Sequence, residues 1–347
     1  MLSLKRKLIC ALMVACLALV MAVPAMAANK PMKVALILSG FLGDKSFNDS
    51  AHQGLLRAKK DFGIDLKVLE SKNPADWEAN LLSMASAKYD LIIGSSTQIA
   101  ELIKKHAASF PDVKFGVIDG AVKAPNVMSI IFAQNEGSFL AGAAAAMFTT
   151  KTNIPGVNDK KIIGWVGGMD IPVLQDFLTG YKQGAKYIDP SVKVLVSFAG
   201  SFSDPLKGKE LAMAQFEQGA DIVMNVASTT GNGILEAAKE KGRYAIGVDM
   251  DQDGIYPGHI LTSMIKRVDV ATYKLVKDVK DNKFKGNTVI EMGVADGGVG
   301  LTDMSVMKKA LGNKFPNDIL VKIKQLTADI RSGKIKVEQY KGFQRGI

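Results

Sequence analysis

Polar and aromatic side chains gather directly after the short apolar runs of this 347-residue chain. They are three carboxylates, one amide and two phenylalanine rings, namely Asp44, Asp119, Asp249, Asn48, Phe47 and Phe202. Carboxylates accept hydrogen bonds from hydroxyl or ring N–H groups, and an amide both donates and accepts. A base stacked on an aromatic ring gains about 1–3 kcal/mol. Together these groups suit a flat, neutral, polar ligand with a sugar-like diol, such as a nucleoside.

Each of these residues also has an ordinary structural explanation. An Asp before a helix is usually a cap, and a Phe usually belongs to a core. Their joint placement after strands is what favours a binding site, so the prediction concerns the group rather than any single residue.

Catalytic motifs are absent from the sequence. His52, His106 and His259 are its only histidines, and none has the spacing of a metal site. No nucleophile elbow, dinucleotide-binding glycine motif or phosphate loop occurs. Gly231-Asn232-Gly233 could open a helix and offer N–H groups to a ligand, or it could be a plain tight turn. We therefore expect no enzyme, no cofactor and no metal.

Short strands and longer amphipathic helices must position the polar residues. The first series has strands at 33–38, 66–69, 90–93 and 114–118 and helices at 47–62, 75–87 and 98–109. After a turn-rich insertion at 154–160, the second has strands at 162–166, 192–198, 222–225 and 244–248 and helices at 173–187, 206–218 and 234–240. This alternation predicts two α/β lobes with parallel sheets. Such sheets bind ligands at the carboxyl ends of their strands, where the polar residues lie.

The N-terminal 28 residues have the features of an export signal. Lys5, Arg6 and Lys7 precede an apolar run that ends at the small-residue triplet 25–27. We expect cleavage after Ala27 rather than a transmembrane anchor, and rather than lipidation at Cys16. Cys10 and Cys16 are the only cysteines, so cleavage would leave none. The expected location is the periplasm.

Charge and composition set further limits. The formal net charge is +10, and loss of the three basic residues in the signal would lower it. The lysines are spread along the chain without a basic-aromatic cluster, which favours a solvated basic surface over nucleic-acid binding. The chain is long enough for two domains of ordinary size.

Four segments resemble one known family. They are GDKSFN at 43–48, NEGSFLAG at 135–142, AIGVDMDQ at 245–252 and LTSMIK at 261–266. Their order and sequence resemble the basic membrane protein family of ABC-transporter solute-binding proteins, the group that contains the purine nucleoside receptor lipoproteins. The resemblance runs from about Lys33 to Thr302.

The resemblance implies a type I periplasmic-binding fold, with two doubly wound parallel-sheet lobes and three crossovers near 132–134, 265–268 and 285–287. After a signal peptide at 1–27, the first lobe would comprise 31–132 and 266–285. The second would comprise 133–265 and 286–312, and 313–347 would form a C-terminal helix and basic tail. A monomer that delivers its ligand to an ABC permease in the inner membrane is also implied.

A purine nucleoside held between two aromatic rings is the ligand that the resemblance implies. Carried onto this sequence, Asp44 and Asn48 belong to the first loop with Phe47 as one ring, and Asp119 closes a later strand. Asp249 and Lys266 would hold the ribose. Phe202 is the expected second ring, with Phe198 and Phe177 as competitors.

Two loops depart from the usual family pattern, at 225–228 (NVAS) and at 95–97 (SST). Both should face the cleft, so pocket shape and ligand could differ. A free purine base or riboflavin is the alternative ligand. A sensory module for a membrane receptor is the alternative role, and a nucleoside hydrolase is disfavoured because no Asp-rich metal motif follows the first strand.

Overall fold

The computed structural model describes residues 30–71 and 73–343. All elements discussed below belong to one compact unit, Met32–Ile347. The predicted signal peptide, with Cys10 and Cys16, lies outside the described residues.

The first sheet has six parallel strands in the order β11-β5-β4-β3-β1-β2. Their bounds are β1 Lys33–Leu38, β2 Asp65–Leu69, β3 Leu91–Ser95, β4 Lys114–Ile118, β5 Val127–Phe132 and β11 Thr288–Met292. The accompanying helices are α2 Phe47–Phe62, α3 Pro74–Ser86, α4 Thr97–His106, the short 3-10 turn Ala107–Ser109 and α9 Val268–Lys280. Central strands such as β3 and β5 are buried along their whole length, as expected for a sheet covered on both faces.

The second sheet has the order β12-β10-β9-β8-β6-β7, in which only β12 is antiparallel to its neighbour. Its strands are β6 Ile162–Gly167, β7 Lys193–Phe198, β8 Ala220–Val226, β9 Tyr244–Asp249, β10 Ile260–Lys266 and β12 Val299–Leu301. Its helices are α5 Gln134–Phe148, α6 Pro172–Ile188, α7 Pro205–Glu217 and α8 Thr229–Glu240. The last elements are α10 Ser305–Leu311, the 3-10 turn Gly312–Lys314 and α11 Asn317–Arg331.

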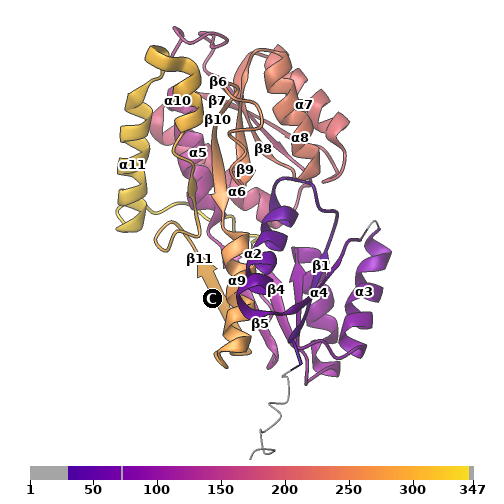
Figure 1. Cartoon of the computed structure of the whole chain (residues 1–347). Coiled ribbons are helices and arrows are strands. Elements are labelled where there is room, and N and C mark those ends of the chain that lie inside the picture. The colour runs from indigo at the N-terminus through magenta and orange to yellow at the C-terminus, as the bar shows by residue number, and fades with distance from the viewer. Residues whose placement is uncertain (1–29, 72, 344–347) are drawn as a thin grey trace, which may run out of the picture. The chain divides into compact units, whose positions relative to one another are not determined.

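Figure 1 shows the two sheets in two separate lobes, with α10 and α11 against the second. The prediction of two α/β lobes with parallel sheets is confirmed.

The chain passes three times between the lobes. It leaves the first sheet after β5, returns between β10 and α9, and leaves again after β11. The third passage therefore follows Met292, and the prediction that placed it at 285–287 and assigned 286–312 wholly to the second lobe is wrong. β11 pairs with β5 along its whole length and completes the edge of the first sheet.

Helices α5 and α6 pack unusually closely, because glycines lie at their contact. An added Cβ at Gly180 would lie 2.0 Å from the backbone carbonyl oxygen of Asn135. One at Gly184 would lie 1.9 Å from that of Phe139. The alanine-rich run of α5 is also buried. Small side chains on both helices thus allow backbone contact that larger side chains would prevent.

We expect Gly184→Ala to lower the free energy of unfolding by about 1–3 kcal/mol, because the new methyl group would overlap the Phe139 carbonyl. Urea denaturation measures the change. Gly254→Ala is the matched control, since nothing lies within 4 Å of an added Cβ there. Equal stability of the two variants would contradict the close-packing explanation.

Candidate functional site

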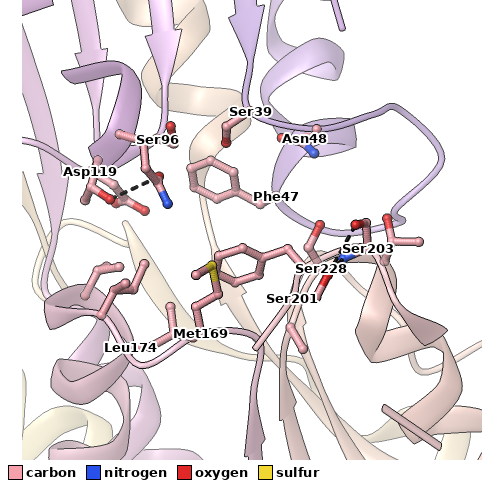
Figure 2. A pocket seen from close by; sticks show the side chains of 18 of the residues that line it. Ser39, Phe47, Asn48, Ser96, Asp119, Met169, Leu174, Ser201, Ser203 and Ser228 are labelled. Carbon is pink, nitrogen blue, oxygen red and sulfur yellow. Dashed lines mark hydrogen bonds between the residues drawn. The ribbon is translucent and has the colours of Figure 1, made fainter. Parts of the chain in front are cut away.

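A cavity of about 280 Å³ lies between the lobes, at the carboxyl ends of strands from both sheets. Figure 2 shows side chains from the first lobe, among them Ser39, Phe47 and Asp119, facing Met169 and Leu174 of the second. Six of the residues predicted for the site line this cavity: Phe47, Asn48, Asp119, Phe202, Asp249 and Lys266. The structure therefore brings together six of the seven residues expected from the sequence.

Lys266, the last residue of β10, carries a buried positive charge at the cavity. Its Nζ donates to Oδ2 of Asp119 over 2.5 Å, and the two side chains are only 1% and 7% exposed. Nζ also lies 5.3, 5.2 and 5.2 Å from the ring centroids of Phe47, Phe132 and Phe177. Aromatic faces attract a cation at this range. The pair joins the lobes, because Asp119 follows β4 of the first sheet.

Asp119 also offers an acceptor oxygen that none of the described residues uses. Its backbone is left-handed, with φ at +63°, an unusual conformation for a residue with a side chain. Its Oδ1 is buried and has no hydrogen-bond partner among the described residues. Buried polar atoms are nearly always satisfied. A ligand N–H or O–H in the cavity would satisfy this oxygen.

Asp249, at the end of β9, is a buried carboxyl whose charge is disfavoured. Burial raises its pKa to about 7, and the nearby carboxylates of Asp44 and Asp119 add to the effect. The charge of Lys266 and a hydrogen bond from the Ser46 hydroxyl act in the opposite direction. Asp249 too is left-handed, with φ at +65°.

Asp44 differs from the other predicted site residues because it does not line the cavity. Its carboxylate accepts from the backbone N–H groups of Ser46, Asn48 and Asp49 over 2.9, 3.0 and 3.1 Å, and so caps the first turn of α2. It also accepts from the Ser228 hydroxyl over 2.8 Å. Burial raises the pKa of Asp44, although these hydrogen bonds oppose the shift. Both carboxylate oxygens of Asp44 therefore accept hydrogen bonds from other residues of the protein.

The aromatic residues divide between the cavity and the core. Phe47 comes from the first lobe and Phe202 from the second, and both line the cavity. The ring of Phe202 lies over Gly168, where an added Cβ would come within 2.3 Å of it. Phe177 also lines the cavity beside Lys266. Phe198 does not, because its ring packs edge-on against Trp165.

Hydrogen bonds that cross the cleft form a second feature of the site. The loop before α2 is bound to the second lobe by Asp44 with Ser228 and by Ser46 with Asp249. In addition, Nε2 of Gln252 donates to the Lys45 carbonyl over 2.9 Å. These contacts hold the lobes together in the form seen in the structure.

Sequence reasoning missed several residues of the site. Ser46 and Gln252 stand inside the motifs that signal the family, so their positions pointed to the site. Ser228 belongs to the divergent loop at 225–228. It lines the cavity, and its backbone has a positive φ of 50°. Trp77 also lines the cavity from α3, and nothing in its surroundings in the sequence indicated this.

The glycines at 231 and 233 belong to a helix rather than to a plain tight turn, but the Gly231 N–H donates to the Ser228 carbonyl over 2.9 Å instead of being left for a ligand. Both lie inside α8, which begins at Thr229. An added Cβ would come within 2.0 Å of Oδ1 of Asn225 at Gly231, and within 1.8 Å of the Pro205 carbonyl at Gly233. They allow α8 to pack closely against its neighbours.

The described part of the chain has neither a metal-binding cluster nor a membrane-spanning helix. No group of three or more His, Cys, Asp or Glu residues there is arranged to hold a metal ion. In the same residues, no helix is both long enough and apolar enough to cross a membrane.

Comparison with known proteins identifies the family. Residues 32–336 match the family model described as ABC transporter substrate-binding protein PnrA-like. The chain belongs to this family. It is 32% identical to a CD4+ T-cell-stimulating antigen of Listeria monocytogenes, over 90% of this chain and 89% of that protein. It is 31% identical to basic membrane protein B of Borrelia garinii, over 84% and 88% of the two chains.

Solved structures confirm the fold. An ABC transporter solute-binding protein from Aeropyrum pernix has a TM-score of 0.84 and 30% identity, and the match covers 90% of this chain and 94% of that one. A sugar transporter from Clostridium phytofermentans, at 14% identity and a TM-score of 0.59, covers 79% of this chain and 99% of its own and supports the fold alone. The protein therefore has the predicted type I periplasmic-binding fold and is an ABC-transporter substrate-binding protein.

The raised pKa of Asp249 predicts a pH-dependent contribution to stability. The folded carboxyl keeps its proton up to about pH 7, whereas the unfolded chain releases it near pH 4. This residue therefore lowers the free energy of unfolding as pH rises from about 4 to about 7, and Asp249→Asn removes that slope. Urea denaturation across this range measures the difference in the free energy of unfolding between variant and wild type, which should grow with pH.

Asp251→Asn, at an exposed carboxylate, should leave the wild-type slope unchanged. Parallel curves for Asp249→Asn and wild type would contradict the assignment.

Proposed function

We propose that the protein binds a purine nucleoside reversibly in its interlobe cleft and delivers it to an ABC permease. The observation that carries this proposal is the buried Oδ1 of Asp119, which has no hydrogen-bond partner among the described residues and belongs to a residue that lines the same cavity as Phe47, Phe202 and Lys266. An acceptor, a cation and two aromatic rings around one cavity suit a flat base joined to a sugar.

Each part of the nucleoside has a matching group. The base would stack between Phe47 and Phe202, which come from opposite lobes. Asn48 and Asp119 would then bind its polar edge. Lys266 donates, and Asp249 accepts when ionised, so these two residues would hold the ribose hydroxyls. Asp44, which the family resemblance placed in the first loop of the site, would act indirectly by fixing the loop that carries Phe47 and Asn48.

The size of the cavity favours small ligands. Its volume of about 280 Å³ is just below the range of about 300–1,000 Å³ common for small-molecule sites. A nucleoside or a free base suits such a volume better than the three-ring system and ribityl chain of riboflavin. A free purine base is therefore the second candidate.

Closure of the lobes would provide both affinity and reversibility. It excludes water, which strengthens hydrogen bonds to the ligand. The ligand would leave when the bonds of Ser46, Ser228 and Gln252 across the cleft break. No covalent step is needed. We further propose that the mature protein acts as a monomer in the periplasm after cleavage of the predicted signal peptide.

Mass spectrometry of ligand released from the purified protein, followed by calorimetric titration, tests this function. The titrants are adenosine, guanosine, inosine, adenine and riboflavin. We expect submicromolar binding of at least one nucleoside. Tight binding of a base or of riboflavin, with all nucleosides inert, would overturn the nucleoside proposal.

Removal of the ribose contacts should separate nucleosides from bases. We expect Asp249→Ala to weaken nucleoside binding about 10- to 100-fold, because the hydroxyl hydrogen bonds are lost. Adenine binding should change less than about threefold. Calorimetry at pH 8 measures both, and Asp251→Asn is the control carboxylate outside the cavity. Equal losses for adenosine and adenine would show that Asp249 does not hold the ribose.

A further inference from the structure

The segment after α11 returns across the second lobe. Residues 337–340, here called the strap, lie just beyond the region matched by the family, which ends at residue 336. Val337 is half-buried, and Phe343, shortly after the strap, is 5% exposed within the core. The strap is thus anchored to the lobe rather than projecting from it.

One set of contacts joins the strap to the beginning of α5. Nδ2 of Asn135 donates to the carbonyl oxygens of Val337 and Glu338, over 3.4 and 3.0 Å. Asn135 is 2% exposed and stands two residues after Ala133, where the chain first passes between the lobes. The strap is therefore bound at one of the three interlobe passages.

A second set of contacts joins the strap to α6. The backbone N–H of Glu338 donates to Oε1 of Gln183 over 2.8 Å. The backbone N–H of Tyr340 donates to Oδ1 of Asp176 over 2.9 Å. Asp176 is fully buried, and its other oxygen accepts from Nε2 of Gln134 over 2.7 Å. One carboxylate thus connects α5, α6 and the strap.

The helix turn that holds Asp176 is also a wall of the cavity. Val173, Leu174 and Phe177 of this turn line it. Phe177 directly follows Asp176, and its ring lies 5.2 Å from Nζ of Lys266. The Tyr340 N–H is one of the donors that this buried carboxylate accepts, so its loss would weaken the hold of the strap on the turn that carries Asp176.

We propose that the strap positions this wall of the cavity, with Asp176 and the Tyr340 N–H as the positioning contact. The strap fixes the first turn of α6 against the start of α5, and so sets where Phe177 meets the ligand and Lys266. The effect on ligand affinity rests on the proposed nucleoside function, whereas the effect on the helix does not.

Tyr340→Pro tests the contact because proline lacks the backbone N–H that donates to Asp176, and the tyrosine side chain lost with it is exposed. Lys341→Pro is the matched control. The Phe343 N–H donates to the Tyr340 carbonyl, which places Lys341 at the second position of a turn, where proline is favoured. Asp176→Asn is a conservative variant, since its amide oxygen can still accept from Tyr340, whereas Asp176→Ala cannot.

Hydrogen exchange of the full-length protein without ligand, followed by adenosine titration, gives two readouts. For Tyr340→Pro we expect at least tenfold faster exchange confined to the first two turns of α6. For Asp176→Ala we expect the same increase there together with one at the start of α5, where Gln134 loses its acceptor. Adenosine binding should be at least fivefold weaker. Lys341→Pro and Asp176→Asn should stay within about twofold of wild type in both readouts.

Three results would overturn the proposal. They are unchanged exchange in α6 of Tyr340→Pro, an equal increase across the whole chain, or the same increase in Lys341→Pro. If wild-type protein binds no adenosine, inosine or guanosine, the nucleoside function fails, and the exchange result alone then decides whether the strap positions α6.

Discussion

A buried charge pair between the lobes is the interaction on which the site depends. The ammonium of Lys266 and the carboxylate of Asp119 are almost fully withdrawn from water, and they come from different lobes. Removing one partner of such a pair typically costs about 3–5 kcal/mol, because the other charge remains buried. Closure of the cleft is therefore coupled to charge neutralisation. The three aromatic rings around Nζ compensate part of the desolvation and also form the walls that a flat ligand needs.

Sharp turns at the strand ends aim the polar groups into the cleft. Asp119, Ser228 and Asp249 are all left-handed, although none is glycine. Such conformations typically cost about 1–3 kcal/mol each and concentrate at functional sites. Here each turn directs a side chain across the cleft or into the cavity, where contacts with the opposite lobe hold it. The interlobe contacts of these side chains therefore maintain the strained backbone of the turns.

Much of the fold follows from sequence pattern, but the partners of individual side chains do not. The strand at 33–38 and the helix at 47–62 were predicted with the bounds that the structure has, because the strand is a continuous apolar run and the helix buries one face. β11 was missed; four of its five residues are only partly buried, at the sheet edge. Asp44 was grouped with the cavity because its position after a strand suits a ligand contact and a helix cap equally well. Phe198 and Phe202 could be distinguished only once packing against Trp165 was known.

The repeated passage between lobes has a consequence for how the chain acquires its structure. The edge strand β11 and the covering helix α9 of the first sheet come from residues after 267, long after the strands that they join. Neither sheet is complete until nearly the whole chain has been synthesised. A protein dominated by such distant contacts folds slowly, and its half-built sheets expose unpaired edges. The same dependence on distant segments makes separate expression of either lobe a poor route to a folded fragment.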